Sequence, residues 1–473
     1  MTTVTHHLEL QHYLTGFSEF GKTAAGRELP WLRELREKSF ARFCQAGFPT
    51  TRDEDWRFTN VAEIARTPFQ LPVGPAQDDG ISAADLAPWR IPGAACQLVF
   101  VNGRFSPKLS SLSRLPVGVE VDSLARKLAL NPSALESHLG RYLNTERDSF
   151  AALNTAFAED GAYVHITRGT VLEAPIHVLF VTVDAGVPTV THPRNLIIAE
   201  ESSQVSVVED YVSLPQADAA ATLSNSATEL LAGDSAVVSH YMLEREHERA
   251  FNVSTLRIQQ GRSANVASHS VLMGGLLVRN NVHPVLAGEG GDCLINGLFV
   301  GGATQHLDNY MLVEHASPHC GSRQFYNGIL DDRAHGVFHG RIVVHKDAQK
   351  TDAKQTNRNL LLSDSAQIDT KPQLEIHADD VKCTHGATIG QIDEDALFYL
   401  RSRGIDLTAA RTLLLLAFAG ECVARMKEEP LRRHIERLMN ERLFRMAAPL
   451  VHAVAVPAPT PAGDLRSTWE KIA

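Results

Sequence analysis

The residues best placed to do chemistry in this sequence are a cysteine and a histidine separated by one threonine, Cys383 and His385. In an extended segment, residues two positions apart point to the same face, with Cα atoms roughly 7 Å apart. A thiolate and an imidazole at that spacing can line one metal or sulfur site. Lys382 lies beside the cysteine, and we expect its charge to lower the thiol pKa. A strand ending at Gly386 would leave the histidine ring exposed at an edge.

A purely structural role is the alternative for this pair. Free cysteine is among the most buried residue types, so Cys383 could simply fill the interior of a β-structure while His385 is a satisfied polar residue. The other cysteines do not decide the matter. The sequence has six cysteines and no C-x-x-C pair. No single short segment therefore contains the cysteine ligands of a zinc site or of a complete iron–sulfur cluster.

A second group of chemically capable residues consists of His335, His339 and His345. Three histidines can hold a catalytic metal. Because no clear carboxylate partner accompanies them, we prefer to interpret them as polar surface.

Residues 16–23, GFSEFGKT, match the phosphate-loop pattern G-x-x-x-x-G-K-[ST]. The pattern requires a buried strand before the loop and a βαβ succession after it. Neither is predicted here, since the preceding LELQHYLT makes a poor buried strand. We interpret the match as chance within an N-terminal helical arm and expect no ATP site on this chain.

The composition is that of a globular protein, with 473 residues, 44% hydrophobic and 21% charged. A formal net charge of −10 argues against binding to nucleic acid or an anionic membrane surface. The start of the sequence does not resemble a signal peptide, and the most apolar run, 413–419, is too short to span a bilayer. We expect a cytoplasmic protein.

The pattern of elements changes twice along the chain. We predict an N-terminal helical region over 1–90, a connecting α/β segment over 91–159 and a β-core over 160–390. A C-terminal helical domain over 391–446 and a flexible tail over 447–473 follow. The stripe of Leu32, Leu35, Ser39, Phe40 and Phe43 predicts an amphipathic helix.

In the β-core, short apolar strands alternate with small and polar turn residues. Stacked coils of a solenoid are favoured because a turn that feeds a strand recurs at intervals of 14–18 or 27–32 residues, although a large sandwich is the alternative. Buried amides could stack as polar ladders between the coils. The recurring turn residues are Gln204, Ala236, Asn265, Asp292, His319, His335, Gln349, Gln367 and Lys382.

Three helices are predicted after the β-core. Asp393 and Thr408 are the expected N-caps of the first two, which end at Gly404 and near Lys427. The second helix is apolar nearly all round, so neighbouring elements or another chain must bury it.

Two segments resemble the SufB/SufD family of iron–sulfur cluster assembly proteins. They are KTDAKQTNRNLLLSDSAQIDTKPQLEIHADDVKCTHGATIGQIDEDALFYLRSRGI at 350–405 and PTTRDEDWRFTN at 49–60. The likeness extends over nearly the whole chain. It is greater to the SufD branch than to the SufB branch, which typically has a His-Glu pair where this chain has His385 and Gly386.

The resemblance implies a right-handed parallel β-helix flanked by helical regions. It also implies a complex with SufB and two copies of the ATPase SufC, which docks on the helices at 393–446. His385 matches the histidine that faces a SufB cysteine where a transient iron–sulfur cluster forms, and Cys383 matches a neighbouring family cysteine of unsettled role. Reduced flavin is associated with the family's complex, but no flavin motif is present.

These expectations describe a non-catalytic scaffold subunit that contributes half of a cluster-assembly interface and borrows the remaining ligands from SufB. A homodimer of the isolated chain is left open. A stand-alone β-solenoid enzyme is the alternative, either a polysaccharide lyase or a metal enzyme that uses His335, His339 and His345.

Overall fold

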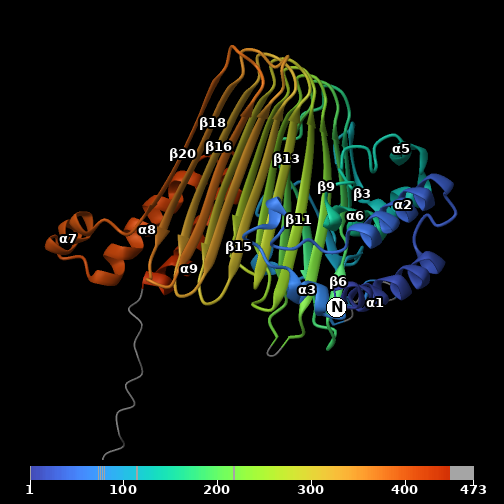
Figure 1. The fold of residues 1–473 in the computed structure, drawn as a ribbon, viewed down its shortest axis with the longest axis horizontal. Coiled ribbons are helices and arrows are strands. Elements are labelled where there is room, and N and C mark those ends of the chain that lie inside the picture. Colours follow the sequence, from blue (N-terminus) through green and yellow to red (C-terminus); the bar gives the residue numbers. More distant parts are fainter. Residues whose placement is uncertain are drawn as a thin grey trace, which may run out of the picture.

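The protein is built around a long solenoid of two mainly parallel β-sheets, with helices at its first coils and on one outer face (Figure 1). The computed structural model describes residues 2–447 except 73, 75, 77, 79, 113, 114, 217 and 218. Nearly all of the predicted flexible tail, 447–473, lies outside the described residues. The predicted mainly-β solenoid flanked by helices is confirmed, and the sandwich alternative is wrong.

The first sheet has the strand order β2-β1-β5-β8-β10-β12-β14-β16-β18-β20. Its strands are β1 (Cys96–Val101), β2 (Arg104–Phe105), β5 (Ile176–Thr182), β8 (Gln204–Ser213), β10 (Val237–Arg245), β12 (Asn265–Leu272), β14 (Asp292–Gly301), β16 (Gly321–Leu330), β18 (Asp352–Leu361) and β20 (Lys382–Gly390).

The second sheet has the order β19-β17-β15-β13-β11-β9-β7-β4-β3, and β6 also pairs with β9. Its strands are β3 (Val119–Ser123), β4 (Ala162–Ile166), β6 (Thr189–Thr191), β7 (Arg194–Ala199), β9 (Thr222–Ala232), β11 (Ala250–Gln260), β13 (Leu277–Leu286), β15 (His306–His315), β17 (His335–Val344) and β19 (Gln367–Ile376).

The coils repeat with the spacing that the turn residues predicted. From β4 onward, a residue pairs in parallel with another 26 to 33 positions further on, as Phe251 does with Leu277 and Arg194 with Ala227. Each marker residue begins a strand or lies just before one. Many coil corners contain a left-handed residue two positions before the strand, such as Ser202 before β8 and Ser235 before β10. Small or polar residues tolerate this conformation best, which explains the pattern seen in the sequence.

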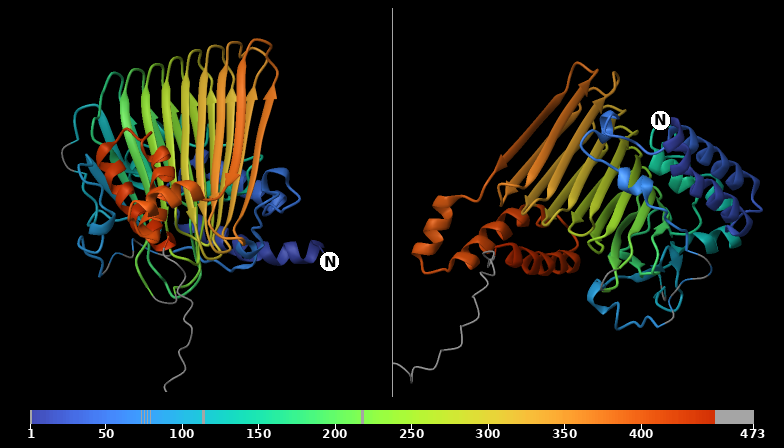
Figure 2. Two further views of the ribbon diagram at one scale, coloured as in Figure 1. Left: turned by 90° about the vertical axis from the view of Figure 1, so that its left-hand side faces the viewer. Right: turned by 60° about the horizontal axis from the view of Figure 1, so that its bottom comes forward.

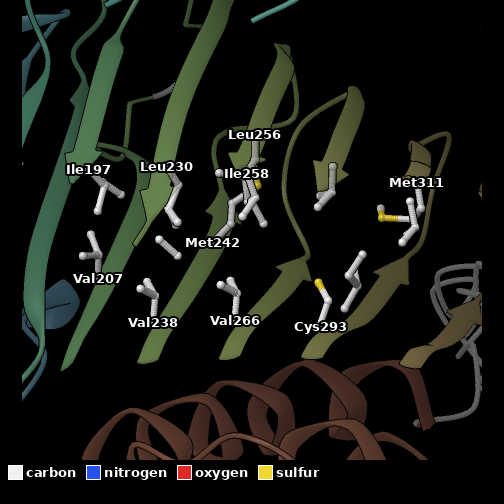
Figure 3. Packing of buried hydrophobic residues seen from close by; sticks show 14 of the residues in the cluster. Ile197, Val207, Leu230, Val238, Met242, Leu256, Ile258, Val266, Cys293 and Met311 are labelled. Carbon is white, nitrogen blue, oxygen red and sulfur yellow. The ribbon is translucent and has the colours of Figure 1, made fainter. Parts of the chain in front are cut away.

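The interior of the solenoid is filled by aliphatic side chains that stack in register from coil to coil (Figure 3). Val238 pairs with Val266, and Val266 with Cys293, so one inward row continues through three coils. Each such side chain stabilises the fold by roughly 1.5–3 kcal/mol relative to an exposed position. The core is therefore continuous along the solenoid axis, and every coil needs a neighbour to cover it.

The N-terminal helices gather at the first coils (Figure 2). As predicted, α2 buries Leu32, Ser39, Phe40 and Phe43, and it ends at Gly47 in a left-handed conformation. The α-helices of this part are α1 (Thr2–Thr23), α2 (Pro30–Ala46), α3 (Ala62–Arg66), α4 (Leu124–Leu130), α5 (Ser133–Glu136) and α6 (Ser149–Ala156), and the 3-10 turns are η1 (Glu54–Trp56) and η2 (Ala87–Trp89).

The segment around η1 lies on the outer face of the second sheet. The Arg279 guanidinium stacks over the Trp56 ring at 3.8 Å, and Glu54 pairs with Lys371 of β19. Thr59 donates a hydrogen bond to Asp308, which is buried. The motif PTTRDEDWRFTN therefore fastens the N-terminal region to strands that come more than 200 residues later.

The C-terminal helices are α7 (Glu394–Ser402), α8 (Leu407–Val423) and α9 (Glu429–Ala447). Asp393 caps α7 as predicted. Two details differ from expectation: Asp406 rather than Thr408 caps α8, and that helix ends at Val423 rather than near Lys427. An aspartate preceding the helix accepts the amide hydrogen bond of Ala409 and so fixes the earlier start.

The helices α8 and α9 cover the outer face of the first sheet, where Leu298, Val300 and Ile329 meet Leu415 and Ile435. Two sheet amides also bind the carbonyls of α8: Asn296 Nδ2 donates to Cys422 at 3.0 Å and Asn327 Nδ2 to Phe418 at 2.8 Å. The expectation that neighbouring elements bury this apolar helix is met on its inner side only, since Leu413 is exposed.

Candidate functional site at the open last coil

The solenoid ends in a coil, formed by β19 and β20, that no further coil covers in the described part of the chain. β20 pairs with β18 and β19 with β17, and the opposite edge of each strand has no ladder among the described residues. Inward-facing side chains that would be buried one coil earlier are consequently exposed. Ile389 at the end of β20 is an example, whereas its register partner Asn359 is buried.

Cys383 and His385 lie on the inward face of β20. They are in register with Ala353 and Gln355 of β18, both of which are buried inside the solenoid. His385 is exposed and Cys383 is half-buried, since the last coil has nothing stacked on it. The structure thus places the predicted pair on one face, at the open end of the hydrophobic interior.

The electrostatics of the cysteine differ from the expectation. Burial raises the pKa of the Cys383 thiol, with a further contribution from the negative charge of Asp352. The prediction that Lys382 lowers this pKa is wrong, because on a strand the lysine points to the opposite face. In this structure Cys383 is therefore a neutral thiol at neutral pH.

The reason for the exposure of His385 also differs. β20 does not end at Gly386 but continues to Gly390, so the histidine lies in the middle of a strand. It is exposed because β20 belongs to the last coil. The ring therefore projects from the middle of an extended strand rather than from its end.

Polar side chains directly beneath the pair form the predicted ladder. Gln355 Nε2 donates to Gln324 Oε1 at 2.8 Å, and both amides are buried. Space for Gln355 exists because Gly340 faces it, where a Cβ would lie only 1.8 Å from the amide nitrogen. The stack Gln324, Gln355, His385 gives the open end a polar centre inside an aliphatic rim.

The three other histidines do not converge on a common point. His335 Nε2 lies 2.8 Å from Asp369, His339 Nε2 lies 2.8 Å from Gln373, and His345 lies 3.6 Å from Glu314. Within the described residues, no group of three or more histidine, cysteine or acidic side chains is arranged to hold a metal ion. His335 and His345 agree with the interpretation as polar surface. For His339 that interpretation is wrong, because its side chain is buried and its ring packs edge-on against Tyr310.

The phosphate-loop match lies wholly within α1, as the interpretation of a helical arm requires. In a helix the backbone amides of the eight residues bond within the helix, so they do not form a phosphate-binding loop.

A second candidate surface lies on the C-terminal helices. Phe398 and Tyr399 of α7 are 75% and 57% exposed, and Leu413 of α8 is 48% exposed. Exposed apolar side chains of this size are typical of surfaces that bind other proteins. We therefore regard α7 and α8 as a candidate interaction surface.

A buried polar cluster inside the middle coils was not predicted from the sequence. His240 Nε2 lies 3.2 Å from Glu209 Oε1, which also accepts a hydrogen bond from Thr228 at 2.7 Å. Burial raises the pKa of Glu209, but the bonds from His240, Thr228 and Tyr211 outweigh it and hold the pKa below its usual value. The signal for this cluster is alternation, since Glu209 and His240 occupy inward positions next to the apolar inward residues Val207 and Met242.

Comparisons with known proteins agree with the geometry. Residues 180–418 match the family model "SUF system FeS cluster assembly, SufBD core domain", and residues 8–178 match "SufBD protein N-terminal region". The chain is 34% identical over 429 residues to an iron–sulfur cluster assembly SufBD family protein of Synechocystis sp., covering 89% of this chain and 93% of the relative.

Two relatives bear the name "Iron-sulfur cluster assembly protein SufD". The one from Escherichia coli is 31% identical over 404 residues, which is 84% of this chain and 90% of the relative. The one from Bacillus subtilis is 24% identical over 445 residues, which is 92% of this chain and 98% of the relative. Among the described helices, none is both long enough and apolar enough to cross a bilayer.

Proposed function

Because the chain belongs to the SufB/SufD family of the SUF iron–sulfur cluster assembly system, we propose that it acts as a scaffold subunit whose open last coil forms half of a cluster-assembly interface. The observation that carries this proposal is the uncovered coil of β19 and β20, with His385 projecting from its inward face. The protein's task in this proposal is to hold ligands and partners, and it makes and breaks no bonds itself.

The partner at the open coil is SufB, a second member of the family. The free edges of two strands, ten residues long in β19 and nine in β20, are matched best by a partner with the same two edges. Pairing of the two last coils would continue both sheets and cover the aliphatic rim. The same edges could pair with a second copy of this chain, so a homodimer of the isolated chain is the competing assembly.

The ligands at this interface are incomplete on one chain. His385 offers one imidazole and Cys383 one thiol, whereas iron–sulfur clusters are ordinarily held by about four protein ligands. Cluster binding at this place therefore requires donors from SufB, and the cluster is a transient product shared by the two chains. Because burial keeps Cys383 protonated, His385 is the stronger candidate for the first ligand.

The docking site for the ATPase SufC is the surface of α7 and α8. Phe398, Tyr399 and Leu413 supply the exposed apolar area that a protein partner would bury. ATP hydrolysis belongs to SufC in this proposal, which agrees with the helical conformation of residues 16–23.

Movement of SufC can reach the open coil because α8 is fastened to the same sheet that ends in β20. Glu421 of α8 pairs with Arg358 of β18 at 2.6 Å, and Asn327 of β16 binds the Phe418 carbonyl. A shift of α8 therefore pulls on β18, which is adjacent to β20, and on β16 beyond it, so that the assembly interface opens during the ATPase cycle. The chain works in the cytoplasm, and the reduced flavin associated with the family's complex is assigned no residues of this chain.

The test is replacement of His385 in the reconstituted complex with SufB and SufC. We expect His385→Ala to assemble normally but to lose most of its iron and sulfide after anaerobic reconstitution. Thr384→Ala is the matched control, because Thr384 is the adjacent exposed residue on the opposite face of β20. Normal iron and sulfide contents in the His385 variant would remove this residue from the mechanism.

A further inference from the structure

We propose that a cavity between α1 and the first coils binds an uncharged, flat heteroaromatic small molecule that carries hydrogen-bond acceptors. The cavity has a volume of about 940 Å³, which is in the range of small-molecule sites. It is formed by α1, the segment at 68–72, the turn at 102–104, the end of α6 and the residues at 190–192. It therefore lies at the other end of the solenoid from the open last coil.

Four aromatic side chains of phenylalanine and tyrosine lie in the wall of this cavity. Phe20 and Phe157 contact each other with ring centres 5.4 Å apart, and Tyr13 lies 6.5 Å from Phe157. Phe69 contributes a fourth ring from the facing segment. Aromatic walls of this kind favour flat ligands, which gain both apolar burial and stacking or edge contacts.

A buried histidine in the wall offers an unused hydrogen-bond donor. His192 is 7% exposed, and its ring stacks on Phe157. Asn225 Nδ2 lies 3.1 Å from His192 Nδ1 and donates to it, so in the neutral ring the proton resides on Nε2. Nε2 is buried and has no hydrogen-bond partner in the described structure.

The orientation of Asn225 is fixed by a second contact. The same amide nitrogen donates to the backbone carbonyl of Phe150 at 3.0 Å, so it cannot be exchanged with the amide oxygen. A buried N–H without an acceptor destabilises the fold, because it has lost its hydrogen bond to water. A ligand acceptor opposite His192 Nε2 would remove that cost.

Two further polar atoms of the wall lack partners. The hydroxyl of Tyr13 is buried and makes no hydrogen bond in the described structure, and neither does Nε2 of His12. Burial raises the pKa of Tyr13 and lowers that of His12, so both groups are neutral at physiological pH. The Tyr13 hydroxyl and the Nε2–H of His192 are therefore neutral donors beside aromatic rings, which matches acceptors on a flat ligand.

The charges around the cavity oppose an ionic ligand. Arg104 is paired with Glu159, and Asp160 accepts hydrogen bonds from one hydroxyl and three backbone amides. Glu19 pairs with Lys22 at the rim. Although the phosphate-loop match contributes to this wall, no unpaired cation is left among these groups for a phosphate.

The experiment compares two bicyclic probes on the full chain by saturation-transfer NMR and calorimetry. Coumarin is uncharged and has two acceptor oxygens and no donor, whereas naphthalene has a similar shape and no acceptor. We expect coumarin to bind at least tenfold more tightly than naphthalene. Tyr13→Phe and His192→Phe should each weaken coumarin binding roughly 3- to 10-fold, as the loss of one hydrogen bond predicts, and should leave naphthalene binding unchanged.

A matched pair of glycine variants tests the location. Gly16 and Gly21 both lie in α1 with open space where a Cβ would be, but only Gly16 lines the cavity. We expect Gly16→Trp to abolish coumarin binding and Gly21→Trp to preserve it, with both variants folded by circular dichroism. The proposal is overturned if coumarin fails to bind at millimolar concentration, binds no more tightly than naphthalene, or binds Gly16→Trp unchanged. Binding of ATP in preference to coumarin would equally overturn it.

Discussion

The two ends of the solenoid differ in how far the edges of their sheets are protected. At the first coils, each sheet finishes in a short antiparallel strand, β2 with two residues and β3 with five, and the N-terminal helices pack beside them. At the last coil, both sheets finish in full-length parallel strands that have no cover in the described residues. Natural proteins seldom leave long edges unprotected, because such edges pair with other chains. The difference indicates that the first end is built for stability and the last end for association.

The burial of ion pairs also differs between the two ends. Arg194 and Glu229 form a salt bridge in the first coils whose side chains are 1% and 0% exposed, and Arg194 also contacts Asn154 and Thr155. At the last coil, Lys350 pairs with Asp380, and both are more than half exposed. Comparable pairs of charges therefore occur in two very different surroundings.

The largest effect we expect is from Arg194→Ala. It leaves the buried carboxylate of Glu229 without its counter-charge, which costs about 3–5 kcal/mol in the free energy of unfolding. Lys350→Ala should cost less than about 1 kcal/mol, because exposed pairs contribute little. Urea unfolding of both variants measures the contrast. Similar losses for the two would show that the first end is not the more tightly built one.

The next effect is the contribution that one histidine of the closed end, His192, makes to the dependence of stability on pH. Burial lowers the pKa of His192 to about 3, below the value of about 6.5 in the unfolded chain. The unfolded state therefore binds the proton more readily, and stability is lost as the pH falls below 6.5. For this one group the loss between pH 7 and pH 5 is about 2 kcal/mol.

The measurement is the free energy of unfolding of the full chain at pH 7 and pH 5, for the native protein and for His192→Phe. We expect the variant to have the shallower pH dependence, whatever its stability at pH 7. An unchanged slope would mean that the histidine is accessible to protons in the folded state.

The sequence predicted the architecture better than it predicted the chemistry of the site. The recurring turn residues located the strands because each coil repeats the same corner, with a left-handed residue just before the strand. The helix at 30–46 could be predicted because its apolar stripe follows the helical period. Both features are determined by residues close together in the sequence, so they can be predicted without knowledge of the tertiary contacts.

The surroundings of Cys383 and His385 depend on contacts that are distant in the sequence. Their common face follows from alternation, but the exposure of His385 depends on β20 being the last strand of its sheet. The pKa of Cys383 is decided by burial against the preceding coil, not by the neighbouring lysine. The cavity at α1 could not be predicted from the sequence for the same reason, because its wall combines residues from five separate segments.

The smallest expected effect is a loss of association caused by a single backbone amide of β20. The amide of Lys382 donates to the carbonyl of Thr351, so alternate amides, including that of Thr388, face β18. The amide of Ala387 consequently faces the free edge. Ala387→Pro removes a donor only from that edge, and proline is tolerated at edge positions of this kind.

We expect Ala387→Pro to leave the stability of the isolated chain nearly unchanged while weakening its binding to SufB by about tenfold, the equivalent of one or two interface contacts. Thr388→Pro is the matched control, since it breaks a bond of the β18 ladder and should destabilise the chain itself. The two measurements are thermal unfolding and the dissociation constant for SufB. If Ala387→Pro binds SufB as tightly as the native chain does, the free edge of β20 does not form the interface, and the contrast between the two ends has a different cause.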